Sequence, residues 1–250
     1  MSADPPILET RGLNKRFGAL EVSRNIDFAL EKGARHALIG PNGAGKTTFV
    51  NQLTGVVRPS SGRVLLDGAD ITDLPQAERT RLGIARTFQI NQLFRGLTAL
   101  ENVALSVAER TGAARSLWRS IGHNGPVVEE AYELLVKLKL QADATRPIRE
   151  LAYGRQRLVE IAIALGSRPK VLLLDEPAAG VPSTESHIIL DVIDELDPSI
   201  AVLIIEHDME VVFRFAREIT VLVAGTVLTS GPPEAIAADA RVRAVYLGQG

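Results

Sequence analysis

The feature that most constrains this chain is a glycine-rich segment, Gly40–Thr47, which reads GPNGAGKT. It fits the pattern G-x-x-x-x-G-K-[ST], and it lies between an apolar run and a helical pattern. In this context backbone N–H groups close around a phosphate, and the following helix adds positive potential at its N-terminus. A chance glycine-rich turn is the alternative, but it leaves the flanking strand and helix signals unexplained. The segment therefore predicts an α/β domain that binds phosphate groups.

Each residue type in this loop has a definite chemical task. Lys46 is expected to reach the β- and γ-phosphate oxygens of a nucleotide, and the Thr47 hydroxyl is placed to ligate Mg²⁺. The predicted nucleotide-binding residues of the loop are Gly40, Pro41, Asn42, Gly43, Ala44, Gly45, Lys46, Thr47 and Thr48. A phosphate loop alone does not distinguish kinases, GTPases, motors and transporters.

An acidic pair follows a second apolar run. The sequence PKVLLLDEP ends its strand pattern with Asp175 and Glu176. An aspartate at the carboxyl end of a strand beside a phosphate loop suits a Mg²⁺ ligand that acts through water. Glu176 is then expected to face the γ-phosphate and to accept a proton from the attacking water, or to orient it. An acidic turn after a strand is the alternative interpretation.

Two further polar residues end predicted strands. His207 follows the apolar run AVLII and could donate a hydrogen bond to a γ-phosphate oxygen, although a histidine there is more often a capping or packing residue. Gln89 ends the strand that precedes a helical region, and its amide could bind the attacking water and the metal shell. Taken alone, Gln89 reads equally as a surface glutamine.

Short apolar runs alternate with helical patterns along the chain, which is typical of an α/β fold. The Asp-Gly pair in LDGAD predicts an antiparallel hairpin in the first third. From about 91 to 149 the strand signal disappears, and helices are predicted at 99–110 and 127–140, as in an inserted helical subdomain. The predicted strands are Ile7–Leu13, Ala34–Ile39, Arg63–Leu66, Ile84–Phe88, Val171–Leu174, Ala201–Ile205 and Thr220–Val223.

Composition excludes several classes of protein. The 250 residues are 46% hydrophobic, which suffices for a large core. A net charge of -2 argues against nucleic acid as the main partner, and the lack of cysteine excludes disulfides and thiolate metal sites. The N-terminus has no signal-peptide pattern, and the apolar runs are too short for a bilayer span. We therefore expect a soluble, cytosolic protein.

The order of the motifs, together with the segment LAYGRQ that opens a helical pattern, resembles the ATP-binding subunit of ABC transporters. The resemblance covers nearly the whole chain. It implies a P-loop NTPase (RecA-like) α/β core with an antiparallel β subdomain and an inserted α-helical subdomain. It also implies a single ABC ATPase domain over 7–245, with its core at about 7–90 and 165–245 and its helical subdomain at about 91–164.

In that family, ATP with Mg²⁺ lies between two subunits arranged head to tail. The resemblance implies that Phe17 stacks on adenine, for which a core phenylalanine is the alternative, and that His207 is the switch histidine. It implies catalytic roles for Glu176, His207, Gln89 and Lys46. The implied metal ligands are Thr47, Gln89 and Asp175.

LAYGRQ would be the signature motif, which acts on the ATP of the opposite subunit. Its residues are Leu151, Ala152, Tyr153, Gly154, Arg155 and Gln156. The common form is LSGGQ, so Ala152 lacks a serine hydroxyl that donates one charge-assisted hydrogen bond, worth about 1.5–3 kcal/mol. Tyr153 replaces a glycine, and Arg155 replaces a glutamine and has no assigned role. Further along, Pro182 stands where the family usually has Asp or Asn, which puts tight coupling between the two ATP sites in doubt.

The residues within these motifs resemble those of branched-chain amino acid importer ATPases. LAYG, DEPAAG, the long helical insert and the C-terminal pattern all point there. ATPases of urea or amide importers and of lipopolysaccharide exporters are alternatives within the family. A soluble ABC ATPase of DNA repair or translation is another alternative, and a phosphoryl-transferring kinase leaves the signature and His207 unexplained.

The resemblance also implies partners and a location. We expect a second ATPase subunit, identical or paralogous, two integral-membrane permeases and, indirectly, a periplasmic binding protein, with no nucleic acid. The segment 90–105 is the expected permease contact, through Phe94, Leu97 and Leu100, for which core packing is an equal alternative. The expected location is the cytoplasmic face of the bacterial inner membrane, as a peripheral subunit. The transported solute is set by the permeases and the binding protein.

Overall fold

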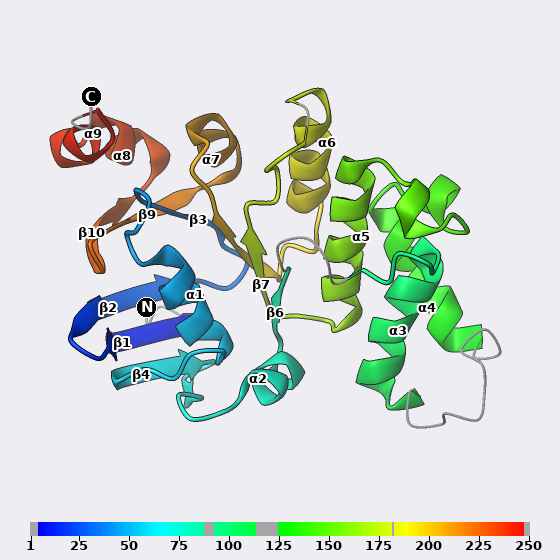
Figure 1. The fold of residues 1–250 in the computed structure, drawn as a ribbon, viewed down its shortest axis with the longest axis horizontal. Coiled ribbons are helices and arrows are strands. Elements are labelled where there is room, and N and C mark those ends of the chain that lie inside the picture. The colour runs from blue at the N-terminus through cyan, green and yellow to red at the C-terminus, as the bar shows by residue number, and fades with distance from the viewer. Residues whose placement is uncertain (1–4, 88–92, 114–124, 182, 248–250) are drawn as a thin grey trace. The chain divides into compact units, whose positions relative to one another are not determined.

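The computed structural model describes residues 5–87, 93–113, 125–181 and 183–247. Contacts divide the chain into two compact units. The first comprises residues 1–84, 170–176 and 197–250, and the second comprises residues 85–169 and 177–196. Figure 1 traces these segments by colour along the chain.

A mostly parallel sheet is the centre of the first unit. Its strand order is β10-β9-β3-β8-β7-β6. The strands β3 and β8 are buried throughout, and β7 is buried up to its last residue, Asp175, as expected for parallel strands covered on both faces. The bounds are β3 (Arg35–Ile39), β6 (Ile84–Arg86), β7 (Val171–Asp175), β8 (Ala201–Ile205), β9 (Glu218–Val223) and β10 (Thr226–Gly231). Because β3, β7, β8 and β9 run parallel, their carboxyl ends lie along one edge of the sheet.

The first unit also contains an antiparallel sheet with the order β2-β1-β4-β5. Its strands are β1 (Leu8–Phe17), β2 (Leu20–Leu30), β4 (Ser61–Leu66) and β5 (Ala69–Asp70). The turn between β4 and β5 has φ of 50° at Asp67 and 77° at Gly68. The predicted Asp-Gly hairpin is therefore confirmed.

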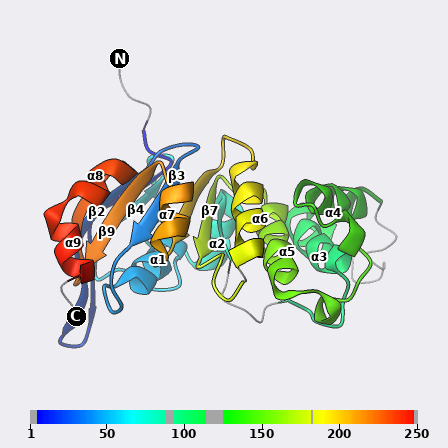
Figure 2. The ribbon, with the colours of Figure 1, turned by 90° about the horizontal axis from the view of Figure 1, so that it is seen from above.

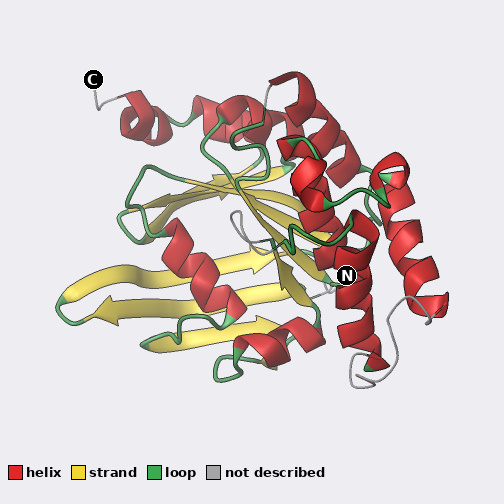
Figure 3. Cartoon of the chain, turned by 45° about the vertical axis from the view of Figure 1, so that its right-hand side comes forward, coloured by secondary structure: helices red, strands yellow, loops and turns green. Residues whose placement is uncertain are grey.

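Helix α1 (Lys46–Thr54) packs into the core that the two sheets share. Its buried residues Phe49, Val50 and Leu53 belong to one hydrophobic cluster with Leu8 of β1 and Leu203 of β8. Figure 3 shows this helix beside the strands of both sheets. The other helices of the unit are α2 (Gln76–Leu82), α7 (Met209–Phe215), α8 (Pro233–Ala238) and α9 (Ala240–Leu247).

Apart from Ala85 and Arg86 of β6, the regular secondary structure in the described part of the second unit is helical. It contains α3 (Ala99–Thr111), α4 (Gly125–Lys137), α5 (Tyr153–Gly166), α6 (Ser183–Asp194) and the 3₁₀ turns η3 (Gln141–Asp143) and η4 (Ile148–Glu150). Helix α3 packs on α4 and α5, and α5 also contacts α6 (Figure 2). Arg110 of α3 forms a close ion pair with Glu130 of α4, at 2.6 Å, and its Nε donates to the Gly166 carbonyl. Both contacts tie α3 to its neighbours.

The predicted strands are found, most of them with bounds that differ by a few residues. β1 extends four residues beyond the predicted end, to Phe17, and the described part of β6 ends at Arg86. The helix predicted over 127–140 is α4, and it ends at Lys137, shortly before Lys139 adopts a φ of 59°. Strand β2 has no counterpart in the prediction, although Ile26, Phe28 and Leu30 alternate with exposed residues along its second half.

Candidate functional site

The phosphate loop links β3 directly to α1. Gly45 is the N-cap of α1 with a φ of 98°, and a Cβ there would lie 2.8 Å from the Val22 carbonyl oxygen. Glycine meets both conditions, since it has no side chain and tolerates a left-handed backbone. The first turn of α1 carries no acidic residue, so its backbone N–H groups and its dipole favour an anion at this end.

The side chain of Lys46 folds back over the phosphate loop. Its ammonium donates to the carbonyl oxygens of Gly40 at 2.6 Å and of Pro41 at 3.1 Å. The pKa of Lys46 lies below its ordinary value, because burial disfavours the charged ammonium; the charges of Glu176 and Asp175 oppose this shift in part. These three charged groups therefore act on one another within a single site.

Glu176 follows β7 at the carboxyl edge of the parallel sheet. Its backbone N–H donates to the Ile205 carbonyl at 2.9 Å, which extends the pairing of β7 with β8. Its φ is 46°, a left-handed conformation that is uncommon for a residue other than glycine, asparagine or aspartate. Such backbone strain is concentrated at functional sites, where surrounding contacts hold it.

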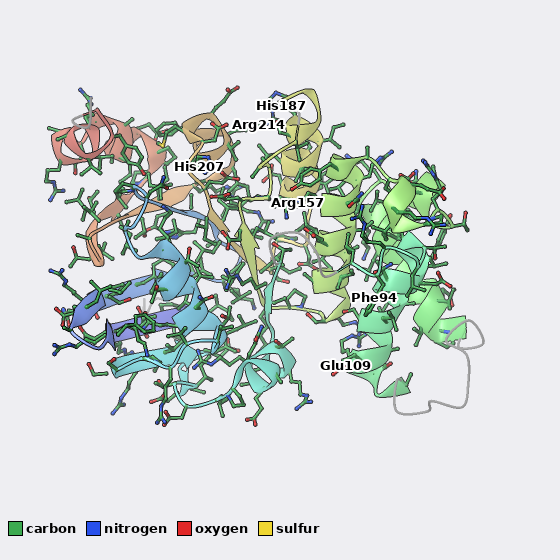
Figure 4. All side chains as sticks on the ribbon, viewed as in Figure 1. Phe94, Glu109, Arg157, His187, His207 and Arg214 are labelled. Carbon is green, nitrogen blue, oxygen red and sulfur yellow. The ribbon has the colours of Figure 1, made fainter. Side chains whose placement is uncertain are left out.

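His207 lies in the short connection between β8 and α7 (Figure 4). Its Nδ1 is 3.3 Å from Oε1 of Glu176, and its side chain is well exposed. The next residue, Asp208, caps α7 by accepting a hydrogen bond from the Glu210 N–H at 2.9 Å. The two residues that the sequence offered as separate strand-end groups therefore lie side by side, and the cap fixes the backbone that follows His207.

The donor groups near Lys46 fit a magnesium ion. Mg²⁺ usually keeps several waters and takes one or two protein oxygens together with substrate phosphates. Thr47, at the start of α1, and Asp175, at the end of β7, supply a hydroxyl and a carboxylate of this kind. In the part of the chain that the structure describes, no group of three or more His, Cys, Asp or Glu side chains could hold a metal by itself. The site thus suits a metal that arrives with phosphates.

Phe17 lies at the end of β1, next to the turn into β2. Its side chain is 50% exposed, so it does not belong to the core, and it pairs across the hairpin with Leu20, which is 65% exposed. The Lys15 ammonium lies 4.9 Å from the centre of the Phe17 ring. Phe17 is thus partly exposed at the surface rather than enclosed in the core.

In the second unit, the LAYGRQ segment forms the start of α5. Ala152 is the N-cap, and its side chain makes no capping hydrogen bond. Gly154 is buried in the first turn, and the Gln156 amide closes the turn by donating to the Leu151 carbonyl at 2.9 Å. The N–H groups at this helix end therefore have the arrangement that binds an external anion.

The structure gives Arg155 a definite set of contacts. Its guanidinium donates to the Lys139 carbonyl at 2.7 Å and lies 3.3 Å from the Asp143 carboxylate. Both partners belong to the turn that follows α4. Arg155 therefore fastens the first turn of α5 to the end of α4.

Two residues of the sequence prediction, Gln89 and Pro182, lie outside the described residues.

A polar contact that the sequence reasoning missed connects α1 with the antiparallel sheet. Gln52 of α1 is fully buried and accepts a hydrogen bond from the Ser23 hydroxyl of β2 at 2.7 Å. Its amide donates to the Asn14 carbonyl of β1 at 3.2 Å. The helix of the phosphate loop is thus tied to the sheet that carries Phe17. The sequence signal is a glutamine among apolar residues of α1 such as Phe49 and Leu53, and it does not reveal a partner.

The phosphate-loop pattern, the acidic pair and His207 thus lie at the carboxyl edge of one parallel sheet, the arrangement that P-loop nucleoside triphosphatases use. A family model described as ABC transporter matches residues 23–179. A second model, described as branched-chain amino acid ATP-binding cassette transporter, matches residues 226–250. The chain belongs to the ABC transporter family, and it is an ATPase of the ATP-binding cassette type.

Similar proteins span almost the whole chain. The high-affinity branched-chain amino acid transport ATP-binding protein BraF of Pseudomonas aeruginosa is 38% identical over 251 residues, which is 98% of each chain. The corresponding protein LivG of Escherichia coli K12 is 37% identical with the same coverage.

Solved structures agree with this fold. The ADP conformation of MJ1267, an ATP-binding cassette of an ABC transporter, matches with a TM-score of 0.87 and 34% identity, over 97% of this chain and 99% of that chain. The cassette MJ0796, in a dimeric post-hydrolysis state with ADP and Pi, matches with a TM-score of 0.76 and 26% identity, over 90% of this chain and 98% of that chain. The fold predicted from the sequence is confirmed.

No described helix is both long enough and apolar enough to pass through a lipid bilayer.

Proposed function

We propose that this chain is the ATP-hydrolysing subunit of an importer for branched-chain or related amino acids. One observation supports the ATP hydrolysis in this proposal: Nδ1 of His207 lies 3.3 Å from Oε1 of Glu176, beside the phosphate loop. The solute class is supported by the second family model, at residues 226–250, and by the names of the similar proteins.

The residues of the first unit divide the chemistry among them. The phosphate loop and Lys46 bind the β- and γ-phosphates of ATP, where the ammonium exchanges the Gly40 and Pro41 carbonyls for phosphate oxygens. Thr47 and Asp175 would hold Mg²⁺, which would neutralise charge on the phosphates. Phe17 stacks on the adenine ring.

Glu176 is the group that activates water. It accepts the proton of the attacking water, or orients that water toward the γ-phosphate. His207 orients the Glu176 carboxylate through its Nδ1 atom, and its ring is exposed enough to reach a γ-phosphate oxygen as well. Both residues act on the γ-phosphate or on the water that attacks it. Hydrolysis therefore requires ATP in the phosphate loop.

A second subunit completes each ATP site in this proposal. The start of α5 offers backbone N–H groups and a helix N-terminus without an acidic residue in its first turn. In a head-to-tail dimer these groups act on the γ-phosphate of the opposite subunit, with Gly154 allowing a close approach. The dimeric state of the similar cassette MJ0796 supports this arrangement.

The permease contact is proposed for the segment that leads into α3. Phe94 is 61% exposed (Figure 4), while Leu97 and Leu100 are partly buried. The buried Asn102 holds this segment by accepting from the Phe94 N–H and donating to the Phe94 carbonyl. A firmly held segment with an exposed aromatic ring is suited to receive a short helix of a membrane partner. We place the subunit on the cytoplasmic face of the membrane, where ATP is available.

The test is the Glu176→Gln variant in the assembled transporter. Removing the carboxylate but keeping its size should lower ATP turnover by about 100-fold or more, since general-base contributions reach that order. ATP should still bind, so the purified variant chain without its membrane partners should accumulate as an ATP-bound dimer in analytical ultracentrifugation. Uptake of radiolabelled leucine into vesicles should stop as well. Near-normal hydrolysis in this variant would remove Glu176 from the proposed role.

A matched control is Glu195→Gln. Glu195 lies in the second unit, is exposed and pairs with Lys139 at 2.9 Å. It should hydrolyse ATP at the wild-type rate, because an exposed pair of this kind contributes little.

A further inference from the structure

Tyr153 stands in the signature segment where the common form has glycine, and its ring makes a specific contact. A Cβ built on Gly180 would lie 3.3 Å from Cε1 of Tyr153 and 3.6 Å from its Oη. Gly180 has a φ of 73°, so both its backbone conformation and the proximity of the ring favour glycine. Both residues belong to the second unit. The ring thus joins the start of α5 to the segment 177–181.

Arg157, one turn further along α5, supports this ring. Its guanidinium lies 5.4 Å from the centre of the Tyr153 ring, and its Nη1 donates to the Glu160 carboxylate at 2.9 Å. Arg157 is only 5% exposed, and its Nε is buried without a hydrogen-bond partner among the described residues. A buried guanidinium with its charge paired in this way has little freedom to move, and it restricts the ring that it covers. Figure 4 shows Arg157 on α5.

A second contact holds the same turn of α5 from another element. Arg155 is bound to the Lys139 carbonyl and to Asp143, both beyond the end of α4. The segment 151–156 is therefore fastened to the body of the helical unit through Arg155 and to residues 177–181 through Tyr153. Glycine at position 153 would leave only the first attachment.

We propose that Tyr153 is a positioning residue that makes the signature segment 151–156 and the segment 177–181 move as one body. Residues 177–181 continue the chain directly from Glu176, so the contact couples the group that meets the partner's ATP to the chain that carries this subunit's own general base. This inference rests on the proposed function. It also supplies a coupling route that does not use position 182, where proline has no N–H to donate.

The experiment compares Tyr153→Phe, Tyr153→Ala and Tyr153→Gly in the assembled transporter, with ATP turnover measured against ATP concentration. Phenylalanine keeps the ring and should therefore retain most of the kcat that the smaller residues lose. Alanine and glycine should lower kcat by about 10- to 100-fold, because a displacement of about 1 Å in a positioned group has effects of that size. ATP binding by the isolated chain should stay within about 2-fold, since residues 40–48 are unaltered.

Alanine separates loss of the ring from added backbone freedom, because alanine favours the helix as glycine does not. The dependence of turnover on ATP concentration should also lose cooperativity in both variants, while Tyr153→Phe retains it. Loss of structural stability alone would lower the active fraction and leave that cooperativity unchanged. Tyr132→Ala is the control, since Tyr132 lies on α4 and is 44% exposed.

Wild-type kcat and cooperativity in Tyr153→Ala would overturn the inference, as would equal losses in Tyr153→Phe and Tyr153→Ala. Failure of the proposed function looks different. In that case Glu176→Gln would retain ATP turnover, whereas failure of this inference alone leaves Glu176→Gln inactive, with the Tyr153 variants either as active as wild type or all impaired to the same degree.

Discussion

His36, in the middle of the parallel sheet, shows how a single buried titratable group makes stability depend on pH. It is 1% exposed in β3, its Nε2 lies 2.8 Å from the Thr220 hydroxyl, and its ring packs edge-on against Phe28 with centroids 5.1 Å apart. Burial disfavours the imidazolium form and lowers the pKa of His36 to about 4 from the ordinary 6.5. The folded protein therefore holds His36 neutral at pH 7.

This shift predicts acid sensitivity of the fold. Between about pH 6.5 and pH 4 the unfolded chain binds more protons at His36 than the folded chain, so the free energy of unfolding falls as the pH is lowered through that window. From pH 7 to pH 5 the loss due to His36 should be about 2 kcal/mol. Urea unfolding at the two pH values, for wild type and for His36→Gln, measures it.

The glutamine variant is expected to be less stable at pH 7, but its stability should fall less between pH 7 and pH 5 than that of the wild type. The control is His187→Gln, because His187 lies on α6 and is exposed. An unchanged pH dependence in His36→Gln would show that other groups cause the acid sensitivity.

At the scale of elements, α1 is held at both ends. Its N-terminus forms the phosphate loop, and its last turn is capped by the side chain of Arg79 from α2. Arg79 is 1% exposed, and its guanidinium donates to the carbonyls of Gln52 and Leu53 at 2.7 and 2.9 Å, and to those of Thr72 and Leu74. Burial lowers the pKa of Arg79 to about 10, which leaves it charged at neutral pH. The positive charge also suits the negative end of the α1 dipole.

Replacing Arg79 by methionine should therefore destabilise the first unit. The variant leaves buried carbonyl groups at the end of α1 without donors, and unpaired groups of this kind predict a loss of about 2–5 kcal/mol in the free energy of unfolding. Arg81→Met is the matched control on the exposed side of α2, and it should stay within about 0.5 kcal/mol of wild type. Equal denaturant midpoints for both variants would contradict the capping role.

The sequence predicted those elements whose signal is local. The run at 171–174 and the run at 201–205 read as buried parallel strands because every side chain in them is apolar, and both are strands. Strand β2 was missed because its alternating pattern is confined to its second half. A left-handed residue at its midpoint, Asn25 with a φ of 46°, interrupts the regular strand geometry. The pairing of β2 with β1 is set by tertiary contacts, including irregular registers.

In the candidate site, too, the sequence predicted the features whose signal is local. The phosphate loop and the acidic pair are local motifs, and the structure places both at one sheet edge. The contact of His207 with Glu176 joins residues that are far apart in sequence, so spacing alone gave no distance between them. The role of Arg155 also depends on a partner in another element, and a single sequence shows no such pairing.

At the scale of the whole molecule, one chain contains a phosphate loop and a signature segment in two different units. In the proposed head-to-tail dimer, each ATP site takes its phosphate loop from one subunit and its signature from the other. Two defects in different chains can then compensate, because one site of a mixed dimer receives both intact halves. This property distinguishes a shared site from a site completed within one subunit.

Ala152→Asp is suited to block the signature without harming the fold. Ala152 is exposed at the N-cap of α5, where aspartate is a preferred residue and should stabilise the helix by about 0.5–2 kcal/mol. The same carboxylate would repel the γ-phosphate of an opposite ATP, so turnover should be lost. Ala152→Ser, which caps the helix without a charge, is the control and should remain active.

Lys46→Ala should also abolish turnover, but through its own phosphate loop, which would no longer bind the phosphates of ATP. When subunits carrying Ala152→Asp and Lys46→Ala are mixed in equal amounts and reassembled with the membrane partners, half of the dimers are mixed and each holds one intact site, so about a quarter of wild-type turnover should return. The measurement is ATP turnover of the mixture against each variant alone. No recovery, where wild-type chains treated identically hydrolyse ATP, would show that the phosphate loop and the signature of different subunits do not form one site.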